Sequence, residues 1–456
     1  MSDLLAVAES VVERAAPGEA VEAYVARGIE TEIRAYDGGV ESLSSATSAG
    51  IGVRVLVGSS AGGGGEGNRV GFAWAGSLDP DVVGAALADA RDNAAYATPD
   101  PAAALAEPDG ASPADLDLWD PELAAMPTEA KVALALALER QVRAADPRIR
   151  QVDSADYGDV ASEVAIATTT GIRATTRRTS AYLSVSAIAG EGADTQTGSG
   201  FSVGRSPGDL DADRAAADAV ERAVRMLGAG KARSGRTTVV FDPRVVSTLL
   251  SVLSTAVSGE AVVKGRSLWA DRLGEQVAAP GIDLADDPTD PRAYGAAAVD
   301  AEGLACRRNV LVEAGVLRGF LYDTVSARRA GAASTGSAVR GGFSGTPGAG
   351  CRALALRPGP LGAAEILEAV GEGLYVQSVT GVHSGVNPVS GDFSVGAEGL
   401  VIRGGELCEP VREVTVASTL QRMLVSILHV GSDVEWLPGI AAGQTLAVAD
   451  LQLSGT

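Results

Sequence analysis

Histidine is almost absent from this chain of 456 residues, which contains only His383 and His429. A zinc site built on two closely spaced histidines, as in His-Glu-x-x-His, therefore cannot form anywhere in the sequence. The two histidines and a cysteine could meet only through the fold, and their spacing gives no sign of it. We expect this chain to hold no metal site and no other cofactor.

Cysteine is also scarce. Cys306, Cys351 and Cys408 are odd in number and far apart, which is typical of a reduced cytoplasmic protein rather than of a disulfide framework. Cys306 is followed by two arginines, which could lower the pKa of its thiol and make it a nucleophile. The pattern favours instead a buried cysteine without a chemical role.

Basic residues are outnumbered, and long apolar runs are missing. The chain has 37 Lys and Arg against 58 Asp and Glu, and its net charge of −21 argues against nucleic acid as a partner. No run of about 18 apolar residues occurs, so the sequence predicts no membrane span. The N-terminal MSDLLAVAES lacks the basic and apolar regions of a signal peptide.

The remaining composition, with 46% hydrophobic and 21% charged residues, is that of a globular protein. We predict an α+β fold. An N-terminal α/β domain at 1–230, with antiparallel strands and long helices, would be followed by a β-rich domain at 231–456. The Pro-, Ala- and Asp-rich segment 97–126 is expected to be a linker or a surface excursion. No internal repeat of fixed period is evident.

An aspartate cap followed by proline predicts the start of a helix at two places, Asp79-Pro80 and Asp242-Pro243. The second has one apolar face, formed by Val246, Leu249, Leu250 and Leu253. It leads into the stretch SGEAVVKG, where Gly259 is expected to close the helix. Glu260 and Lys264 would then be local surface or interface charges.

Two later segments are typical of β-hairpins. In RRNVLVEAGVLRGFLYD, alternating strands flank Glu313-Ala-Gly315, and in segment 385–420 two strands flank the turn RGGE. We expect both hairpins to build a sheet with exposed edges, where an extended peptide can add as a strand. No Gly-x-Ser-x-Gly elbow comes with the acid and histidine of a triad, and no phosphate-binding loop is present.

These C-terminal segments resemble the TldD/PmbA family, a "modulator of DNA gyrase" family whose PmbA-type members are also called TldE. The strings similar to that family's signatures, in the same order, are VDAEGLACRRNVLVEAGVLRGFLYDTVSARR, STG (334–336), GVNPVSGDFSVGAEGLVI and EPVREVTVAS. The resemblance covers most of the chain.

The resemblance implies an N-terminal α/β region, a β-rich C-terminal domain and a heterodimer of TldD-type and TldE-type subunits. The pair acts as a metalloprotease on unfolded or short peptides, in peptide degradation or in peptide natural-product maturation. The TldD-type subunit carries His-Glu-x-x-x-His and a distant cysteine, which hold the metal, expected to be zinc. Metal-bound water attacks the peptide carbonyl, with the glutamate as general base. The TldE-type subunit lacks the motif.

This sequence departs from the TldD pattern where the metal motif would stand. One register places Gly259, Glu260 and Lys264 at the motif positions, and another places Leu250, Ser251 and Thr255 there. Neither register supplies a histidine. The ammonium group of Lys264 has no lone pair to give to a metal near neutral pH.

The sequence therefore predicts a TldE/PmbA-type subunit, the non-catalytic half of a cytoplasmic metalloprotease, with a metal-bearing TldD-type partner and an extended peptide as substrate. The residues expected to face the peptide cavity, or else to form a structural turn, are Gly391, Asp392, Phe393 and Ser394. Two alternatives stay open. One is a stand-alone homodimer that binds peptides without cleaving them, and the other is an enzyme acting through Cys306 or a serine.

Overall fold

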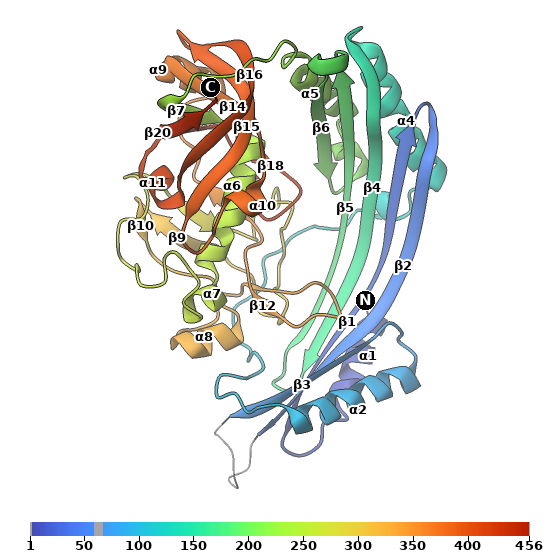
Figure 1. Ribbon diagram of the computed structural model, residues 1–456. Coiled ribbons are helices and arrows are strands. Elements are labelled where there is room, and N and C mark those ends of the chain that lie inside the picture. The colour runs from blue at the N-terminus through green and yellow to red at the C-terminus, as the bar shows by residue number, and fades with distance from the viewer. Residues whose placement is uncertain (1, 59–66, 456) are drawn as a thin grey trace.

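A long antiparallel sheet forms one side of the molecule (Figure 1). The computed structural model describes residues 2–58 and 67–455. The strands of this first sheet lie in the order β3-β2-β1-β4-β5-β6. Their bounds are β1 Glu19–Tyr36, β2 Gly39–Gly58, β3 Asn68–Ala75, β4 Ile149–Thr168, β5 Arg173–Ala189 and β6 Gln196–Gly204.

Helices cover one face of the first sheet. They are α1 Ser2–Val12, α2 Pro80–Tyr96, the short α3 Pro121–Ala124, α4 Thr128–Ala145 and α5 Ala212–Val224, with 3-10 turns at Gly192–Asp194 and Pro207–Asp209. One cluster of buried apolar residues joins α1 and α2 to β1 and β2. A second cluster joins α4 and α5 to β4 and β5. Apolar residues at helical spacing therefore hold the sheet from this side.

The arrangement helix, three strands, helix occurs twice, as α1-β1-β2-β3-α2 and as α4-β4-β5-β6-α5. The two copies meet where β1 pairs with β4. In each copy a glycine of the last strand lets the following helix approach closely. A Cβ on Gly71 would lie 1.8 Å from the carbonyl oxygen of Ala90, and a Cβ on Gly200 would lie 1.8 Å from that of Ala215. The repeat thus resides in packing rather than in a sequence period.

The C-terminal half is built on a second sheet in the order β16-β15-β14-β7-β20-β17. Its strands are β7 Gly235–Phe241, β14 Glu372–Thr380, β15 Asp392–Arg403, β16 Glu406–Thr419, β17 Ile427–Val430 and β20 Leu446–Ser454. β7 and β14 are parallel, and the other neighbours are antiparallel. A further pairing between β16 and β20 closes five strands into a ring.

Helix α6, Pro243–Val257, packs its apolar face on the core of the second sheet. The Asp242 side chain accepts a hydrogen bond from the backbone N–H of Arg244, which confirms the predicted cap. The remaining elements are short: α7 Gly259–Val263, β8 Leu284–Asp286, β9 Asn309–Glu313, β10 Val316–Leu317, α8 Thr324–Ala330, β11 Ala338–Val339, β12 Gly348–Ala349, β13 Leu354–Leu356, α9 Ala363–Val370, α10 Val382–Gly385, α11 Leu420–Val425, β18 Glu435–Trp436 and β19 Ala442–Gly443.

Both predicted hairpins form. β9 and β10 pair through a turn at Ala314 and Gly315, and β15 and β16 pair through Gly404 and Gly405, all four with positive φ. The expectation of free edges at the second hairpin is wrong for β15, which lies between β14 and β16, and for residues 415–417 of β16, which pair with β20. The first residues of β16 have β15 as their only described strand partner. A free edge also occurs in β2, whose residues 39–50 have β1 on one side and no described partner on the other.

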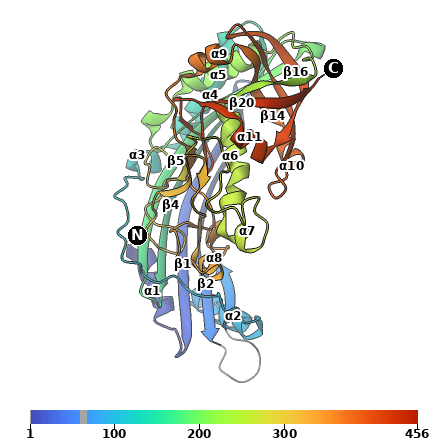
Figure 2. The ribbon, with the colours of Figure 1, turned by 90° about the vertical axis from the view of Figure 1, so that its left-hand side faces the viewer.

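The two halves form two layers, with the long strands extending past the C-terminal half toward α2 (Figures 1 and 2). Segment 97–126 crosses between them and is no free surface excursion, since Ala103, Leu105 and Leu118 are buried. The fold is α+β, as predicted. No helix in the described ranges has the length and apolarity needed to cross a membrane.

Candidate functional site

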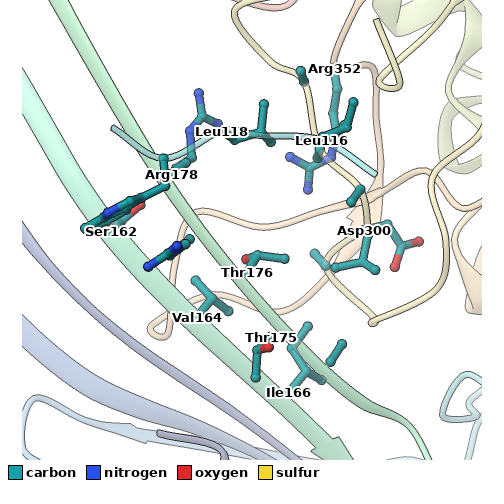
Figure 3. A pocket seen from close by; sticks show the side chains of 18 of the residues that line it. Leu116, Leu118, Ser162, Val164, Ile166, Thr175, Thr176, Arg178, Asp300 and Arg352 are labelled. Carbon is teal, nitrogen blue, oxygen red and sulfur yellow. The ribbon is translucent and has the colours of Figure 1, made fainter. Parts of the chain in front are cut away.

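A cavity of about 440 Å³ lies between the first sheet and the C-terminal half (Figure 3). β4 and β5 bound it on one side, and residues 116–119 and 296–301 bound it on others. Side chains reach it from alternate positions of β4, namely Ser162, Val164 and Ile166, because successive residues of a strand point to opposite faces. The intervening Ala165 and Ala167 pack in the cluster that contains α1.

Part of the cavity lining is apolar. The side chains that form this part are Leu116, Leu118, Val164, Ile166, Ala296 and Val299. Leu118 is held in place by its backbone, since its carbonyl oxygen accepts a hydrogen bond of 2.9 Å from the N–H of Thr179 on β5. The predicted linker therefore supplies a wall of the cavity. A pocket of this size, with an apolar wall and a few polar groups, suits a small ligand.

The rest of the lining is rich in arginine, with Arg177, Arg178, Arg340 and Arg352 against Asp117 and Asp300. Arg178 donates to the carbonyl oxygen of Tyr294 at 2.8 Å, and Arg352 to that of Ala338 at 3.2 Å. The guanidinium of Arg177 lies 5.2 Å from the ring centre of Trp119. Among the described residues, no carboxylate forms an ion pair with Arg177, Arg178 or Arg352.

The surroundings of Arg178 disfavour its charged form. Burial lowers the pKa of its guanidinium, and the like charges of Arg205 and Arg352 lower it further. Asp300 offers little compensation, because its oxygens accept hydrogen bonds from the backbone N–H groups of Glu302, Leu304 and Ala338. The cavity is thus locally electropositive in a chain whose net charge is −21.

A buried charge network lies beside the cavity. Arg54 donates two hydrogen bonds to the carboxylate of Glu22, at 2.9 and 2.5 Å, and Arg340 donates a third at 2.7 Å. The side chains of Glu22 and Arg340 are each 1% exposed. Burial opposes ionisation of Glu22, but Arg340 and Arg54 outweigh it and lower its pKa to about 2. Arg340 also lies 4.3 Å from the ring centre of Tyr24, which lines the cavity.

Glu302 completes the network at a distance of 3.9 Å from Arg54. Its Oε2 accepts hydrogen bonds from the backbone N–H and the hydroxyl of Thr324, while Oε1 has no hydrogen-bond partner among the described residues. Burial raises the pKa of Glu302 to about 7, although Arg54 opposes this. Glu302 is therefore a group that exchanges a proton near neutral pH.

Sequence reasoning missed this network. A signal was present for two members, because Glu22 and Arg54 each interrupt an apolar strand, in VEAYVARG and GIGVRVLVG. A charged side chain inside such an apolar run is stable only if it has a partner of opposite charge in the interior. The two residues are indeed direct cross-strand partners. Nothing local in the sequence marks Arg340, which lies 318 positions from Glu22.

The stretch SGEAVVKG forms the start of a short helix rather than the end of α6. Ser258 caps α6, and Gly259 is the first residue of α7. A Cβ on Gly259 would lie 2.1 Å from the ring of Tyr322 and 2.7 Å from the carbonyl oxygen of Leu321. Close packing therefore explains this glycine, which has no positive φ, and the expectation that it closes α6 is wrong.

The two charges of this stretch pair with each other. Lys264 and Glu260 form an i,i+4 ion pair and are about half exposed, at 46% and 47%. Both lie at the surface of this chain, and whether they belong to an interface stays a prediction. Glu260 also borders a shallow pocket that reaches Arg54 and Asp323. The pairing occupies the Lys264 ammonium, so neither Gly259 nor Lys264 has a side-chain lone pair to give to a metal.

The second register of the motif falls on α6. Leu250 is buried in the core, Ser251 donates to the carbonyl oxygen of Ser247 at 2.8 Å, and Thr255 is exposed. These side chains do not converge on one point. Within residues 2–58 and 67–455, no group of three or more His, Cys, Asp and Glu side chains is arranged to hold a metal ion.

The Gly391–Ser394 stretch does not reach the interdomain cavity. Gly391 has φ +84° and lies against the side chain of Gln421, while Phe393 is buried in the core of the second sheet. Asp392 and Ser394 are exposed near the start of β15. A role of these residues in a peptide cavity stays a prediction.

The cysteines give no sign of nucleophilic chemistry. Burial raises the pKa of the Cys306 thiol to about 12, despite the neighbouring arginines, and raises that of Cys351 well above its usual value. The predicted burial of Cys306 is confirmed, and its lack of a chemical role stays a prediction. All three cysteines are free thiols.

Comparison with known proteins covers nearly the whole chain. Sequence models of PmbA/TldA metallopeptidases match it in three consecutive parts: domain 1 at residues 21–95, the central domain at 121–227 and the C-terminal domain at 234–455. The first part spans the first helix–strand repeat without α1, and the second part spans the other repeat.

Individual relatives agree with these models. Metalloprotease PmbA of Escherichia coli O157:H7 is 28% identical over 391 residues, covering 85% of this chain and 84% of that protein. A Metalloprotease TldD homolog of Haemophilus influenzae is also 28% identical, over 72% of this chain and 70% of that protein. The crystal structure of TldE from Thermococcus kodakarensis has the same fold, with a TM-score of 0.88, 23% identity and full coverage of both chains.

Proposed function

Because this chain belongs to the TldD/PmbA family of metallopeptidases, we propose that it is the TldE/PmbA-type subunit of a two-subunit peptidase. It pairs with a TldD-type subunit that holds the metal ion, zinc, and together they hydrolyse unfolded or short peptides, for degradation or for maturation of a peptide product. Relatives named PmbA and TldD match this chain at equal identity, so the subunit type must be argued from residues.

One observation carries the proposal: neither register of the metal motif places a histidine at a metal-ligand position. Gly259 has no side chain and no room for one, and the Lys264 ammonium is paired with Glu260. The family's metal therefore does not fit this chain at the motif positions, and we derive no step through it here. A metallopeptidase fold with this deficit needs the metal site of another subunit.

The three free thiols support a reducing compartment, the cytoplasm, for this subunit. The free edge of β2 supports the pairing. Residues 39–50 present an extended backbone edge, and Val40 and Leu43 beside it are 44% and 48% exposed. Monomeric proteins usually protect such an edge with charges, proline or a bulge. We assign this edge to contact with the partner subunit.

The test is a peptidase assay on this chain alone, on a TldD-type subunit alone and on an equimolar mixture, with an unfolded peptide as substrate. We expect cleavage by the mixture and its loss on adding a chelator. Replacing the glutamate of the partner's His-Glu-x-x-x-His by glutamine should abolish cleavage. The matched variant Glu260→Gln in this chain should leave it unchanged.

Two outcomes would count against the proposal. Chelator-resistant cleavage by this chain alone would make it an enzyme in its own right, acting through a serine or cysteine. Peptide binding by a homodimer, with no cleavage when the TldD-type subunit is added, would favour the alternative of a stand-alone peptide-binding protein.

A further inference from the structure

The cavity between the two halves has no role in the proposed pairing, yet it has the features of a ligand site. It combines an electropositive region with an apolar wall in one partly open space of about 440 Å³. We propose that it binds the terminal carboxylate of a short peptide, with the apolar side chain of the last residue against Leu116, Val164 and Ile166. The inference concerns the isolated chain and goes beyond the subunit role.

Arginine outnumbers acidic side chains in the cavity lining. Arg178 and Arg352 both reach the cavity, Arg178 from β5 and Arg352 from the segment after β12 (Figure 3). Neither forms an ion pair with a described residue. Asp300 and Asp286 offset part of the Arg352 charge, and an anion in the cavity relieves the remaining repulsion between Arg178 and Arg352.

Two arginines of the lining also hold buried donors without acceptors. Among the described residues, Nε and Nη1 of Arg340 and Nε of Arg352 have no hydrogen-bond partner, although these atoms are shielded from solvent. A buried N–H group that lacks an acceptor costs free energy. The Arg340 side chain is 1% exposed and is fixed by Glu22 and Tyr24, so it cannot turn outward to find water. Because protein atoms cover these three N–H groups, a carboxylate in the cavity interacts with Arg340 and Arg352 through their charge rather than through these donors.

The apolar wall of the cavity distinguishes between possible anions. Inorganic phosphate would leave the apolar side of the cavity empty, because Leu116, Val164 and Ile166 offer no hydrogen bonds. A peptide that ends in an apolar residue fills both parts, with its carboxylate on the arginines and its side chain on the wall. Planar guanidinium groups also match the two oxygens of a carboxylate. The carboxylate of a short apolar peptide therefore satisfies more of the lining than a free mineral anion does.

The experiment is isothermal titration of the full chain with N-acetyl-Gly-Leu, with its C-terminal amide and with inorganic phosphate. We expect the acid to bind and the amide to bind at least roughly tenfold more weakly, since the amide lacks the charge that the arginines recognise. Arg352→Gln should weaken binding of the acid by roughly tenfold or more. Arg357→Gln is the matched control, because Arg357 is 74% exposed and pairs with Asp283 outside the cavity.

A second variant tests the apolar wall. Leu116→Ala should weaken binding of N-acetyl-Gly-Leu by several fold and leave binding of N-acetyl-Gly-Gly nearly unchanged, because only the leucine side chain uses the wall. Equal binding of acid and amide would overturn the proposal on the unmodified chain, whatever the stability of the variants. Binding of phosphate in preference to the acid would also overturn it. The titrations need no partner subunit, so their failure leaves the proposed pairing untouched.

Discussion

At the scale of single residues, Glu302 is a buried carboxylic acid whose ionised form has little stabilisation. Its carboxyl group is fully buried, one of its oxygens has no hydrogen-bond partner among the described residues, and its nearest cation, Arg54, already holds Glu22. The carboxylates of Glu22 and Glu302 thus both interact with the charge of Arg54. Arg340 donates its hydrogen bond to Glu22. The folded protein therefore favours the protonated form of Glu302, with a pKa of about 7 against 4.5 in the unfolded chain.

This shift predicts a pH-dependent effect of Glu302→Gln. Between pH 4.5 and about 7 the folded state binds more protons at this site than the unfolded state, so stability falls as pH rises through this window. Glutamine cannot ionise and avoids the loss. Urea unfolding at pH 4 and pH 8 should show the variant gaining on the parent by up to about 3 kcal/mol at the higher pH.

Other titrating groups cancel from this comparison, because they are present in both proteins. Thr324→Val provides a control at the same site, since it removes a hydrogen bond to Glu302 Oε2 but keeps the titrating carboxyl group. A Glu302→Gln difference that stays constant from pH 4 to pH 8 would show that Glu302 does not titrate in this range in the folded protein.

The sequence could reveal only part of this chemistry. Glu22 and Arg54 are detectable as charges inside apolar strands, and the absence of a histidine pair is plain from the composition. Glu302 lies in a Gly- and Ala-rich loop, where the sequence predicts that a glutamate is exposed. Its burial depends on the packing of the C-terminal half on the first sheet, which is a property of distant segments.

At the scale of elements, the two helix–strand repeats share one packing device. Gly71 on β3 and Gly200 on β6 each face the helix that follows, α2 and α5, at a distance that excludes a methyl group. In both places the obstructing atom is a helix carbonyl oxygen, which cannot move without shifting the helix. These glycines therefore determine how closely α2 packs on β3 and α5 packs on β6.

Gly71→Ala and Gly200→Ala should each destabilise the protein by about 2 to 3 kcal/mol, because the added methyl group overpacks the contact between strand and helix. Urea unfolding curves would measure both. Gly39→Ala on β2 is a suitable control, since its Cβ would meet no atom closer than 4.0 Å. If all three variants behaved alike, close helix approach would not be the function of these two glycines.

Elements with strong local signals were predictable. Helix α6 begins after Asp242, and the β9–β10 hairpin turns at Ala314 and Gly315, because caps and turns depend on adjacent residues. The pairing of β16 with β20 and the parallel pairing of β7 with β14 were not predictable. They join segments far apart in the sequence, and the hydrophobic alternation of a strand does not specify its partner.

At the scale of the whole molecule, buried charges join the two halves. Glu22 and Arg54 belong to the first sheet, whereas Arg340 and Glu302 belong to the C-terminal half. A second such contact links Arg222 of α5 to Asp242, the cap of α6, at 2.6 Å. Each contact leaves an uncompensated buried charge if the halves separate without admitting water. We expect the halves to unfold together because these contacts couple them.

Arg340→Met tests this coupling. Methionine keeps much of the volume of the side chain, and Glu22 retains its two hydrogen bonds from Arg54, so the first sheet should stay intact. The contact across the interface is lost, which should destabilise the protein by about 2 to 4 kcal/mol. Calorimetry should then show two transitions in place of one, as the halves begin to unfold separately.

The matched control is Arg357→Met, since the exposed pair of Arg357 with Asp283 lies within the C-terminal half and should contribute less than about 1 kcal/mol. A single transition in Arg340→Met at the parental temperature would mean that apolar contacts such as those of Leu304 and Phe343 with Tyr24 and Ile166 are sufficient to couple the halves.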